Sequence, residues 1–304
     1  MLYLYYKNTK PYKTEEIYIM RNVFMRYPDG KAKALTFSYD DGVPQDKRLA
    51  ELFDRYGMKA TFNFNCEYMR ETNFTKEEIK EYFLSKGHEI AVHGANHRAN
   101  GNLRPIEGIR DVLDCRLELE EKCERIIRGM AYPDSGITQM GSLGSYEQIK
   151  NYLIELDIAY SRTLCGDNDS FLLPEDFHAW MPSAHHNNPR IMEYVEKFLN
   201  LDVSKIYDAR RIPRLFYIWG HSYEFDQRDN WSHMEEICQR LSRNPDIWYA
   251  TNIEIYDYVR AYKSLSYSAD GYMIYNPTLI DVWLDVDGAV YKIESGKTLK
   301  IDKS

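Results

Sequence analysis

In the stretch LTFSYDDG, residues 35–42 of this 304-residue chain, an apolar, β-prone run ends in two adjacent carboxylates and a glycine. A strand sends neighbouring side chains to opposite faces, and neighbouring acids repel each other. Asp-Gly is a common turn, so Asp40 and Asp41 have a simple interpretation as the end of a strand. The alternative interpretation gives them chemistry: one carboxylate holds a cation while the other handles a proton.

On both sides of this stretch, short apolar runs alternate with amphipathic segments of helical period. The predicted strands are 34–39, 59–65, 89–94, 129–133, 158–162, 214–221 and 246–250. The predicted helices are 45–57, 75–87, 105–128, 145–156, 189–199, 231–242 and 252–262. This alternation implies a parallel sheet with right-handed crossovers, and its number of units favours a (β/α) barrel over an open sheet. No glycine-rich phosphate loop follows a predicted strand, which argues against a nucleotide-binding fold.

The pattern changes near residue 268. Residues 269–304 contain short alternating runs separated by predicted turns at Asp287-Gly288 and Ser295-Gly296, which indicates a small antiparallel β appendage. We therefore predict a barrel domain over residues 1–267 and an appendage over residues 268–304 that packs on the barrel.

Composition limits the partners and the compartment. The formal net charge of −8 and the scattered Lys and Arg residues argue against nucleic-acid binding and against a membrane-surface patch. No apolar run is long enough to span a membrane, and the N-terminus lacks the features of a signal peptide. The five cysteines form no CxxC pair. We expect a reducing compartment and a cytoplasmic protein. The sequence does not determine the oligomeric state.

The candidate catalytic and binding residues lie at the predicted C-terminal ends of strands, where the active sites of α/β barrels are found. These residues are Asp40, Asp41, His93, Tyr132, Pro133 and His221. The motif HGANH at 93–97 places two histidines four residues apart, and a helical turn after the strand, eased by Gly94, would let both bind one cation. Two histidines and an Asp also serve non-haem iron enzymes. A second acid that is not a ligand favours hydrolysis, in which a base deprotonates a metal-activated water.

TFSYDDG, HGANH and the late strand ending in WGH resemble motifs one, two and five of the polysaccharide deacetylase family, the NodB-homology or carbohydrate esterase family 4 type. The resemblance covers roughly residues 30–262. It implies a distorted (β/α) barrel that removes acetyl groups from N-acetylated amino sugars of a carbohydrate substrate. It also implies one divalent metal ion, usually zinc, bound by Asp41, His93 and His97, with Asp40 as general base and His221 as general acid.

Two family motifs are altered. Motif three reads GMAYPDSG at 129–136, where only Tyr132 and Pro133 fit. We predict that both lie at the substrate and that a backbone N–H of this region helps to hold the oxyanion. Motif four is replaced by YSRTL at 160–164, so the partners of Asp40 and His221 stay open. Arg162 either replaces the missing arginine or is structural.

Several neighbouring residues have two interpretations each. Trp219 either lines the substrate groove or packs in the core. Glu224 and Asp226 either tune His221 or belong to a solvated loop. His185 and His186 are expected to be loop residues.

The function predicted from these residues is metal-dependent hydrolysis of an N-acetyl amide in a carbohydrate. One alternative is hydrolysis of a small cyclic amide on the same barrel, which a lidded pocket would favour over an open groove. The other is a carbohydrate-binding relative without catalysis. Retention of Asp40 and His221 argues against this second alternative, because a binding protein needs neither an acid nor a base.

Overall fold

The computed structural model describes residues 21–72, 74–134, 136–137, 143–164, 166–205 and 211–302. The N-terminal segment 1–20, in which no signal peptide is expected, lies outside the described residues. Cys165 and Ser135 of motif three lie outside them too.

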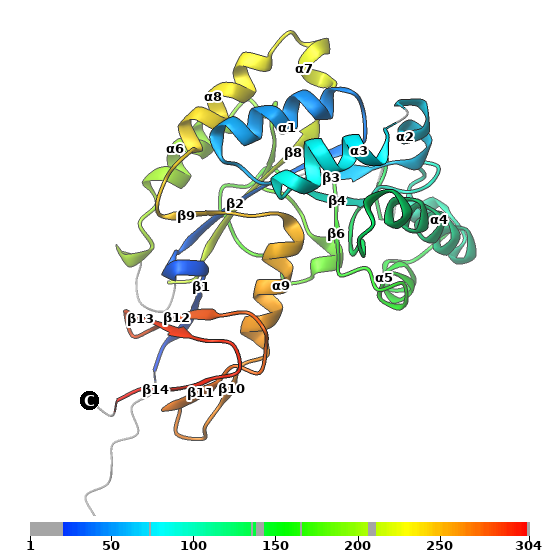
Figure 1. The fold of residues 1–304 in the computed structure, drawn as a ribbon. Coiled ribbons are helices and arrows are strands. Elements are labelled where there is room, and N and C mark those ends of the chain that lie inside the picture. Colours follow the sequence, from blue (N-terminus) through cyan, green and yellow to red (C-terminus); the bar gives the residue numbers. More distant parts are fainter. Residues whose placement is uncertain are drawn as a thin grey trace, which may run out of the picture.

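Eight parallel strands form the central sheet. They are β2 (Lys33–Asp41), β3 (Ala60–Phe64), β4 (Glu89–Val92), β5 (Gly129–Ala131), β6 (Tyr160–Arg162), β7 (Ala184–His185), β8 (Arg214–His221) and β9 (Ile247–Tyr249). Their order is β6-β5-β4-β3-β2-β8-β7, and β9 pairs with the first half of β2. The sheet curls into a half-barrel with β2 near its centre (Figure 1), which confirms the predicted fold class.

Helices cover this sheet on both faces. They are α1 (Gln45–Tyr56), α2 (Cys66–Thr72), α3 (Lys76–Glu78), α4 (Pro105–Cys123), α5 (Tyr146–Glu155), α6 (Ile191–Asn200), α7 (Glu224–Gln227), α8 (Trp231–Leu241) and α9 (Asn252–Lys263). The main core joins the sheet to α1, α4, α5, α6 and α8, whereas α9 packs with β2 and β8 in a second apolar cluster. Among the described residues, no helix combines the length and the apolar character needed to cross a bilayer.

The alternation of β2 separates apolar from polar side chains. Leu35, Phe37 and Tyr39 belong to the main core with the outer helices. On the other face, the Asn63 amide donates to Ser38 Oγ and to Asp40 Oδ1, at 2.8 Å each. Because side chains alternate along a strand, Asp40 lies on this inner polar face, where the site is built.

Two predicted helices differ in detail. Thr75 and Glu78 form a capping box at the start of the helix predicted at 75–87, but this helix continues as a π-helical turn over Ile79–Phe83 and a 3-10 turn over Leu84–Lys86. The helix at 105–128 ends at Cys123, because Glu124 adopts a left-handed φ of 53°. A single left-handed residue is enough to stop the i to i−4 hydrogen bonding.

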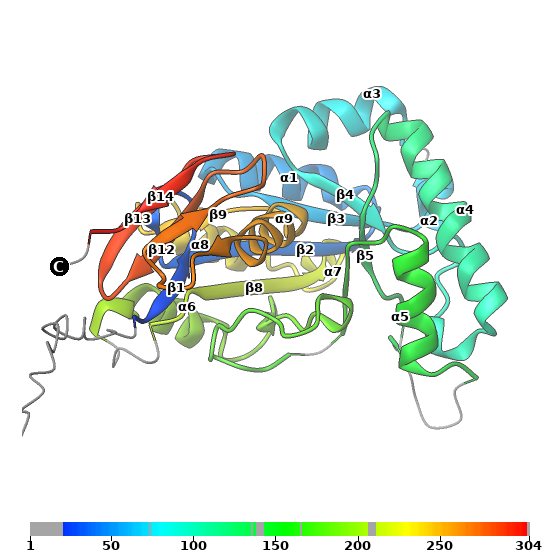
Figure 2. The ribbon, with the colours of Figure 1, turned by 90° about the horizontal axis from the view of Figure 1, so that it is seen from below.

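Within the described residues, the C-terminal part forms antiparallel β structure, as predicted, and this structure is divided between two three-stranded sheets. Strands β10 (Ser266–Tyr267), β11 (Met273–Tyr275) and β14 (Thr298–Lys300) form one of them. Strands β12 (Val282–Val286) and β13 (Ala289–Ile293) form the other with β1 (Val23–Arg26), a strand that was not predicted. In Figure 2 these sheets lie at the opposite end of β2 and β8 from α2 and α7. The domain boundary at residue 268 stays a prediction.

Candidate active site

Three side chains at the C-terminal end of the half-barrel form an arrangement that could hold a cation. Asp41 ends β2, His93 follows β4 directly, and His97 lies four residues later. His93 Nε2 and His97 Nε2 lie 3.5 and 3.3 Å from Asp41 Oδ1. The donor atoms of all three residues lie within 4.8 Å of one another. The structure therefore brings the three predicted ligands together.

The surroundings of this triad fit a divalent cation. Within the described residues, neither His93 Nε2 nor Asp41 Oδ1 makes a hydrogen bond, although both atoms are buried. Unpaired buried polar atoms are costly, and two imidazoles with a carboxylate are donors that Zn²⁺ prefers. His93 Nδ1 lies 3.0 Å from the Ala131 carbonyl, a contact that turns Nε2 into the triad. Burial lowers the pKa of His93, which keeps the ring in its neutral, metal-binding form.

The HGANH segment reaches this geometry without the predicted helical turn, so that prediction was wrong. Gly94 and His97 have positive φ angles of 80° and 48°, and the segment is a loop. Asp111 of α4 anchors the loop: its Oδ1 accepts the backbone and side-chain amides of Asn96 at 2.9 and 2.8 Å. A Cβ on Gly94 would lie 2.6 Å from Asp111 Oδ2. Only glycine therefore lets the loop approach α4 this closely.

Asp40 lies beside the triad, in a separate set of contacts. Its Oδ2 accepts a hydrogen bond from Arg162 Nη2, and its Oδ1 accepts one from Asn63. Burial opposes the ionised form of Asp40, but the charges that face it, above all that of Arg162, outweigh the effect of burial, and the pKa of Asp40 is lowered overall. Arg162, which was weighed as a replacement for the missing arginine, is fully buried and pairs with Asp40.

His221 lies across the strand pair from Asp40, because β2 and β8 are in register at these two residues. Its Nε2 is 4.0 Å from Asp40 Oδ2, and its Nδ1 is 2.9 Å from Glu224 Oε1. Burial opposes the charged form of His221, but the bond to Glu224 and the charge of Asp40 raise the pKa overall. Asp226, the other acid that was weighed for this task, instead accepts hydrogen bonds from Gln45 and Trp231.

The three residues predicted to bind substrate are buried and contact other parts of the protein; they are Tyr132, Pro133 and Trp219. The backbone N–H of Tyr132 donates to the Arg162 carbonyl at 2.9 Å, and its hydroxyl donates to the His178 carbonyl at 2.8 Å. Pro133 is buried near Gly94. Trp219 is 8% exposed, and the Arg162 guanidinium lies 4.6 Å from its ring centre. Trp219 therefore supports the arginine that holds Asp40.

Sequence reasoning missed two residues that shape the site. Asn63 of β3 donates a hydrogen bond to Asp40, as Arg162 does, and Asp111 accepts the hydrogen bonds that hold the histidine loop in place. Asn63 carried a usable signal, because it lies near the end of a predicted strand beside β2. Asp111 carried none, since it is one of many acids on an amphipathic helix.

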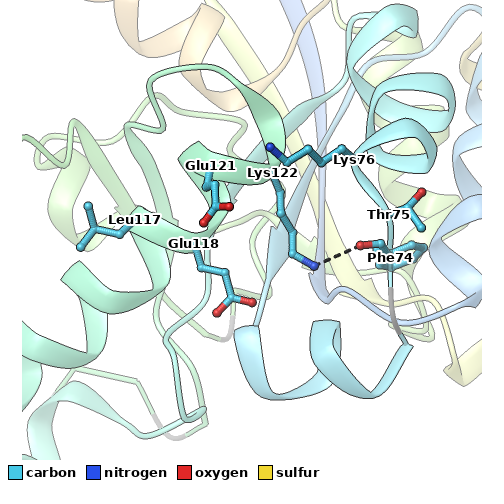
Figure 3. A pocket seen from close by; sticks show the side chains of 7 residues that line it. All are labelled: Phe74, Thr75, Lys76, Leu117, Glu118, Glu121 and Lys122. Atoms are coloured by element: carbon cyan, nitrogen blue, oxygen red, sulfur yellow. Dashed lines mark hydrogen bonds between the residues drawn. The ribbon is translucent and has the colours of Figure 1, made fainter.

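A surface hollow between α3 and α4 lies apart from this site (Figure 3). It is lined by Phe74, Thr75, Lys76, Leu117, Glu118, Glu121 and Lys122, and Lys122 Nζ donates to the Phe74 carbonyl at 3.1 Å. This lining has mixed charges and contains no histidine or cysteine, so it does not resemble the metal-binding and acid–base groups of the site.

Comparison with known proteins agrees with this fold. Three solved structures are similar: a protein assigned as a polysaccharide deacetylase from Mycobacterium smegmatis, another from Pseudomonas aeruginosa PAO1, and PuuE allantoinase. Their sequence identities are 16, 14 and 12%, and their TM-scores are 0.54, 0.54 and 0.55. The matches cover 79, 76 and 76% of this chain and 94, 92 and 91% of the respective structures. At these identities the likeness is one of fold.

The sequence itself matches a family model over part of its length. Residues 27–141 match the polysaccharide deacetylase model, and this range includes β2, the histidine loop and the whole triad. No curated protein matches the sequence. The resemblance to the polysaccharide deacetylase family that the motifs predicted is thus confirmed by sequence over residues 27–141, and the half-barrel has the fold of the two solved structures assigned as polysaccharide deacetylases.

Proposed function

We propose that this chain is a metal-dependent hydrolase that removes the acetyl group from N-acetylated amino sugars of an oligosaccharide or polysaccharide. One observation carries the proposal. A triad suited to a cation lies beside an ionised carboxylate and an imidazole whose pKa is raised, all at one end of the half-barrel. Two titratable groups whose surroundings push their pKa values apart are typical of an acid and base pair.

Asp41, His93 and His97 would hold the ion, and zinc is the metal that this donor set favours. A bound divalent cation supplies Lewis acidity, which polarises the acyl group and acidifies water. Asp40 takes one proton from the water molecule that attacks the acetyl carbon. Arg162 and Asn63 keep Asp40 ionised and fixed in direction, so its free lone pairs are available for that proton.

His221 supplies the second proton transfer. As the bond between the acetyl carbon and the nitrogen breaks, the nitrogen takes a proton from His221 Nε2 and leaves as an amine. The acyl carbon leaves as acetate with the oxygen of the water. Glu224 and Asp40 favour the protonated imidazole before this step.

The substrate class is tested by acetate release from a panel of N-acetylated oligosaccharides, after metal removal and after return of Zn²⁺. We expect release from at least one member, loss of activity without metal, and recovery with Zn²⁺. A cyclic ureide belongs in the same panel, because PuuE allantoinase has a similar fold. Turnover of the ureide alone would replace the sugar proposal, and no turnover of either class with bound metal would favour a binding protein.

The role of Asp40 is tested with Asp40→Asn, which keeps the volume but not the basicity. We expect activity to fall by about 10²–10⁴-fold, the usual cost of losing a general base, while Zn²⁺ content stays unchanged. Asp41→Asn is the matched comparison and should lose the metal as well. Full activity in Asp40→Asn would reduce Asp40 to a strand-end residue.

A further inference from the structure

Side chains from two segments of the chain, the end of β8 and residues 185–187, contact Glu224. Its Oε1 lies 2.9 Å from His221 Nδ1 and 3.2 Å from His185 Nε2. Its Oε2 accepts the Asn187 amide at 2.8 Å, and Asn230 in turn donates to the Asn187 side-chain oxygen at 2.9 Å. A carboxylate has about four lone-pair sites, so two donors on one oxygen compete for the same electron density.

His185 and His186 had been expected to be ordinary loop residues, and His186 is instead fully buried beside Glu224. The donor atoms of His185, His186 and Glu224 lie within 4.8 Å of one another, as in a cation site. One hydrogen bond argues against a cation: the Asn187 backbone N–H donates to His185 Nδ1 at 3.1 Å. In the neutral ring the proton is therefore on Nε2, which leaves that atom no lone pair for a metal. His185 Nε2–H donates to Glu224 instead.

We propose that Glu224 is the positioning residue of His221, and that His185 sets the strength of this pair by donating to the same carboxylate oxygen. The proposal rests on the proposed function in naming His221 as the acid. By binding Nδ1, Glu224 holds the ring so that Nε2 faces Asp40 and the triad. Asn187 holds the second oxygen and is itself held by Asn230, so the carboxylate does not turn away.

Glu224 and His185 change the pKa of His221 in opposite directions. A carboxylate next to Nδ1 stabilises the imidazolium, so removing its charge lowers the pKa of His221. The donor from His185 draws density from Oε1, so removing this donor strengthens the bond to His221 and raises that pKa. The other groups that face His221 are unchanged by either substitution; they are Asp40, Asp41, His186 and Tyr223.

The experiment is an NMR titration of His221 in the unmodified chain, Glu224→Gln and His185→Phe. Phenylalanine keeps a ring against Trp219, where the ring of His185 packs edge-on at 4.9 Å, but it has no donor. We expect the His221 pKa to fall by about 1–2 pH units in Glu224→Gln and to rise by a few tenths in His185→Phe. The alkaline limb of the acetate-release profile should move in the same directions.

Asp226→Asn is the matched control, because it removes an acid from the same short helix without touching His221. It should leave the His221 pKa unchanged. An unchanged pKa in Glu224→Gln, or a fall in His185→Phe, would overturn the proposal. The titration needs no turnover, so it separates this proposal from the proposed function: expected shifts without acetate release would refute the function alone.

Discussion

Asp41 has a left-handed backbone φ and Asp40 does not, and for this reason the two carboxylates have different partners. Asp40 continues the strand and lies opposite His221 in register. Asp41 has a φ of 92°, a left-handed value that is unfavourable for any residue with a Cβ. The strand therefore ends at Asp41, and the Asp41 side chain faces the histidines of the neighbouring loop. The two adjacent acids are compatible here because Arg162 and Asn63 stabilise Asp40, whereas Asp41 faces His93 and His97.

The first prediction concerns the strain at Asp41. Asp41→Gly and Asp41→Ala both remove the triad carboxylate, so neither should bind Zn²⁺ tightly. Glycine adopts a φ of 92° without steric cost, whereas alanine does not. Without metal, the glycine variant should have a free energy of unfolding about 1 kcal/mol higher than the alanine variant. Urea unfolding of both variants measures this, and an alanine variant of equal or greater stability would show that the position is unstrained.

The second prediction concerns His221 and follows from the leaving group. An amide nitrogen must be protonated to leave, whereas the alkoxide of an activated aryl acetate leaves without help. His221→Ala should therefore lower the rate of N-deacetylation by about 10²–10⁴-fold and lower aryl acetate hydrolysis far less. His178→Ala is the control, because His178 bonds the Ile158 carbonyl away from the site. Equal loss on both substrates would indicate that His221 supports the loop or the oxyanion.

At the scale of elements, the half-buried carboxyl of Glu89 connects β3, β4, β6 and α9 at the other end of the strands. Glu89, the first residue of β4, accepts hydrogen bonds from Thr61 of β3 and Tyr160 of β6, each at 2.7 Å. It also accepts the N–H of Ile253 in the first turn of α9, at 2.9 Å. A Cβ on Gly129 of β5 would lie 2.5 Å from Glu89 Oε1, so the space around the carboxyl is closed.

The third prediction is a pH dependence of stability from this carboxyl. Burial raises the pKa of Glu89 from 4.5 to about 7 in the folded protein. A raised pKa means that the folded state binds the proton more tightly, so the stabilisation is complete below pH 4.5 and is lost as the pH rises through 7. Relative to Glu89→Gln, which does not titrate, the free energy of unfolding should fall by about 3 kcal/mol across this range. Urea unfolding at pH 4.5 and pH 8 measures the difference, and parallel pH profiles would contradict the prediction.

At the scale of the whole molecule, local periodicity predicted most of the barrel. The strand at 34–39 and the helix at 45–57 were predictable because the signals for each lie within the segment itself. The strand is an apolar, β-prone run, and the helix has a helical period that ends at Gly57. The triad was predicted from the resemblance of TFSYDDG and HGANH to the family motifs, and the positions of Asp41 and His93 at strand ends agree with it. Strand β7 was not predicted, because two residues are too few to show the alternation of apolar and polar side chains that identifies a strand.

What the sequence did not reveal depends on contacts between distant segments. Arg162 reaches Asp40 across 122 positions, and this requires the strand order of the finished sheet. Strand β1 pairs with β12 near the other end of the chain, and a four-residue run gives no sign of so distant a partner. The buried ion pair of Arg26 with Asp285 follows from that pairing.

The last prediction tests whether this pairing ties the C-terminal sheets to the barrel in one cooperative unit. Asp285 Oδ2 lies 2.5 Å from Arg26 Nη2 and from Arg211 Nη2, and its side chain is 2% exposed. Asp285→Asn would leave two guanidinium groups beside a neutral amide, so breaking the pair should cost about 3–5 kcal/mol. Asp281→Asn is the matched control, because Asp281 pairs with Lys292 at the surface of the same sheet.

Calorimetry of both variants gives the measurement. If β1 and β12 belong to the same unit as the barrel, Asp285→Asn should lower the melting temperature of a single transition by several degrees. Asp281→Asn should melt like the unmodified chain, since exposed pairs contribute little. A second, earlier transition in Asp285→Asn, with the main transition unmoved, would mean that the C-terminal sheets unfold by themselves. The division at residue 268 would then separate two folding units as well as two patterns of sequence.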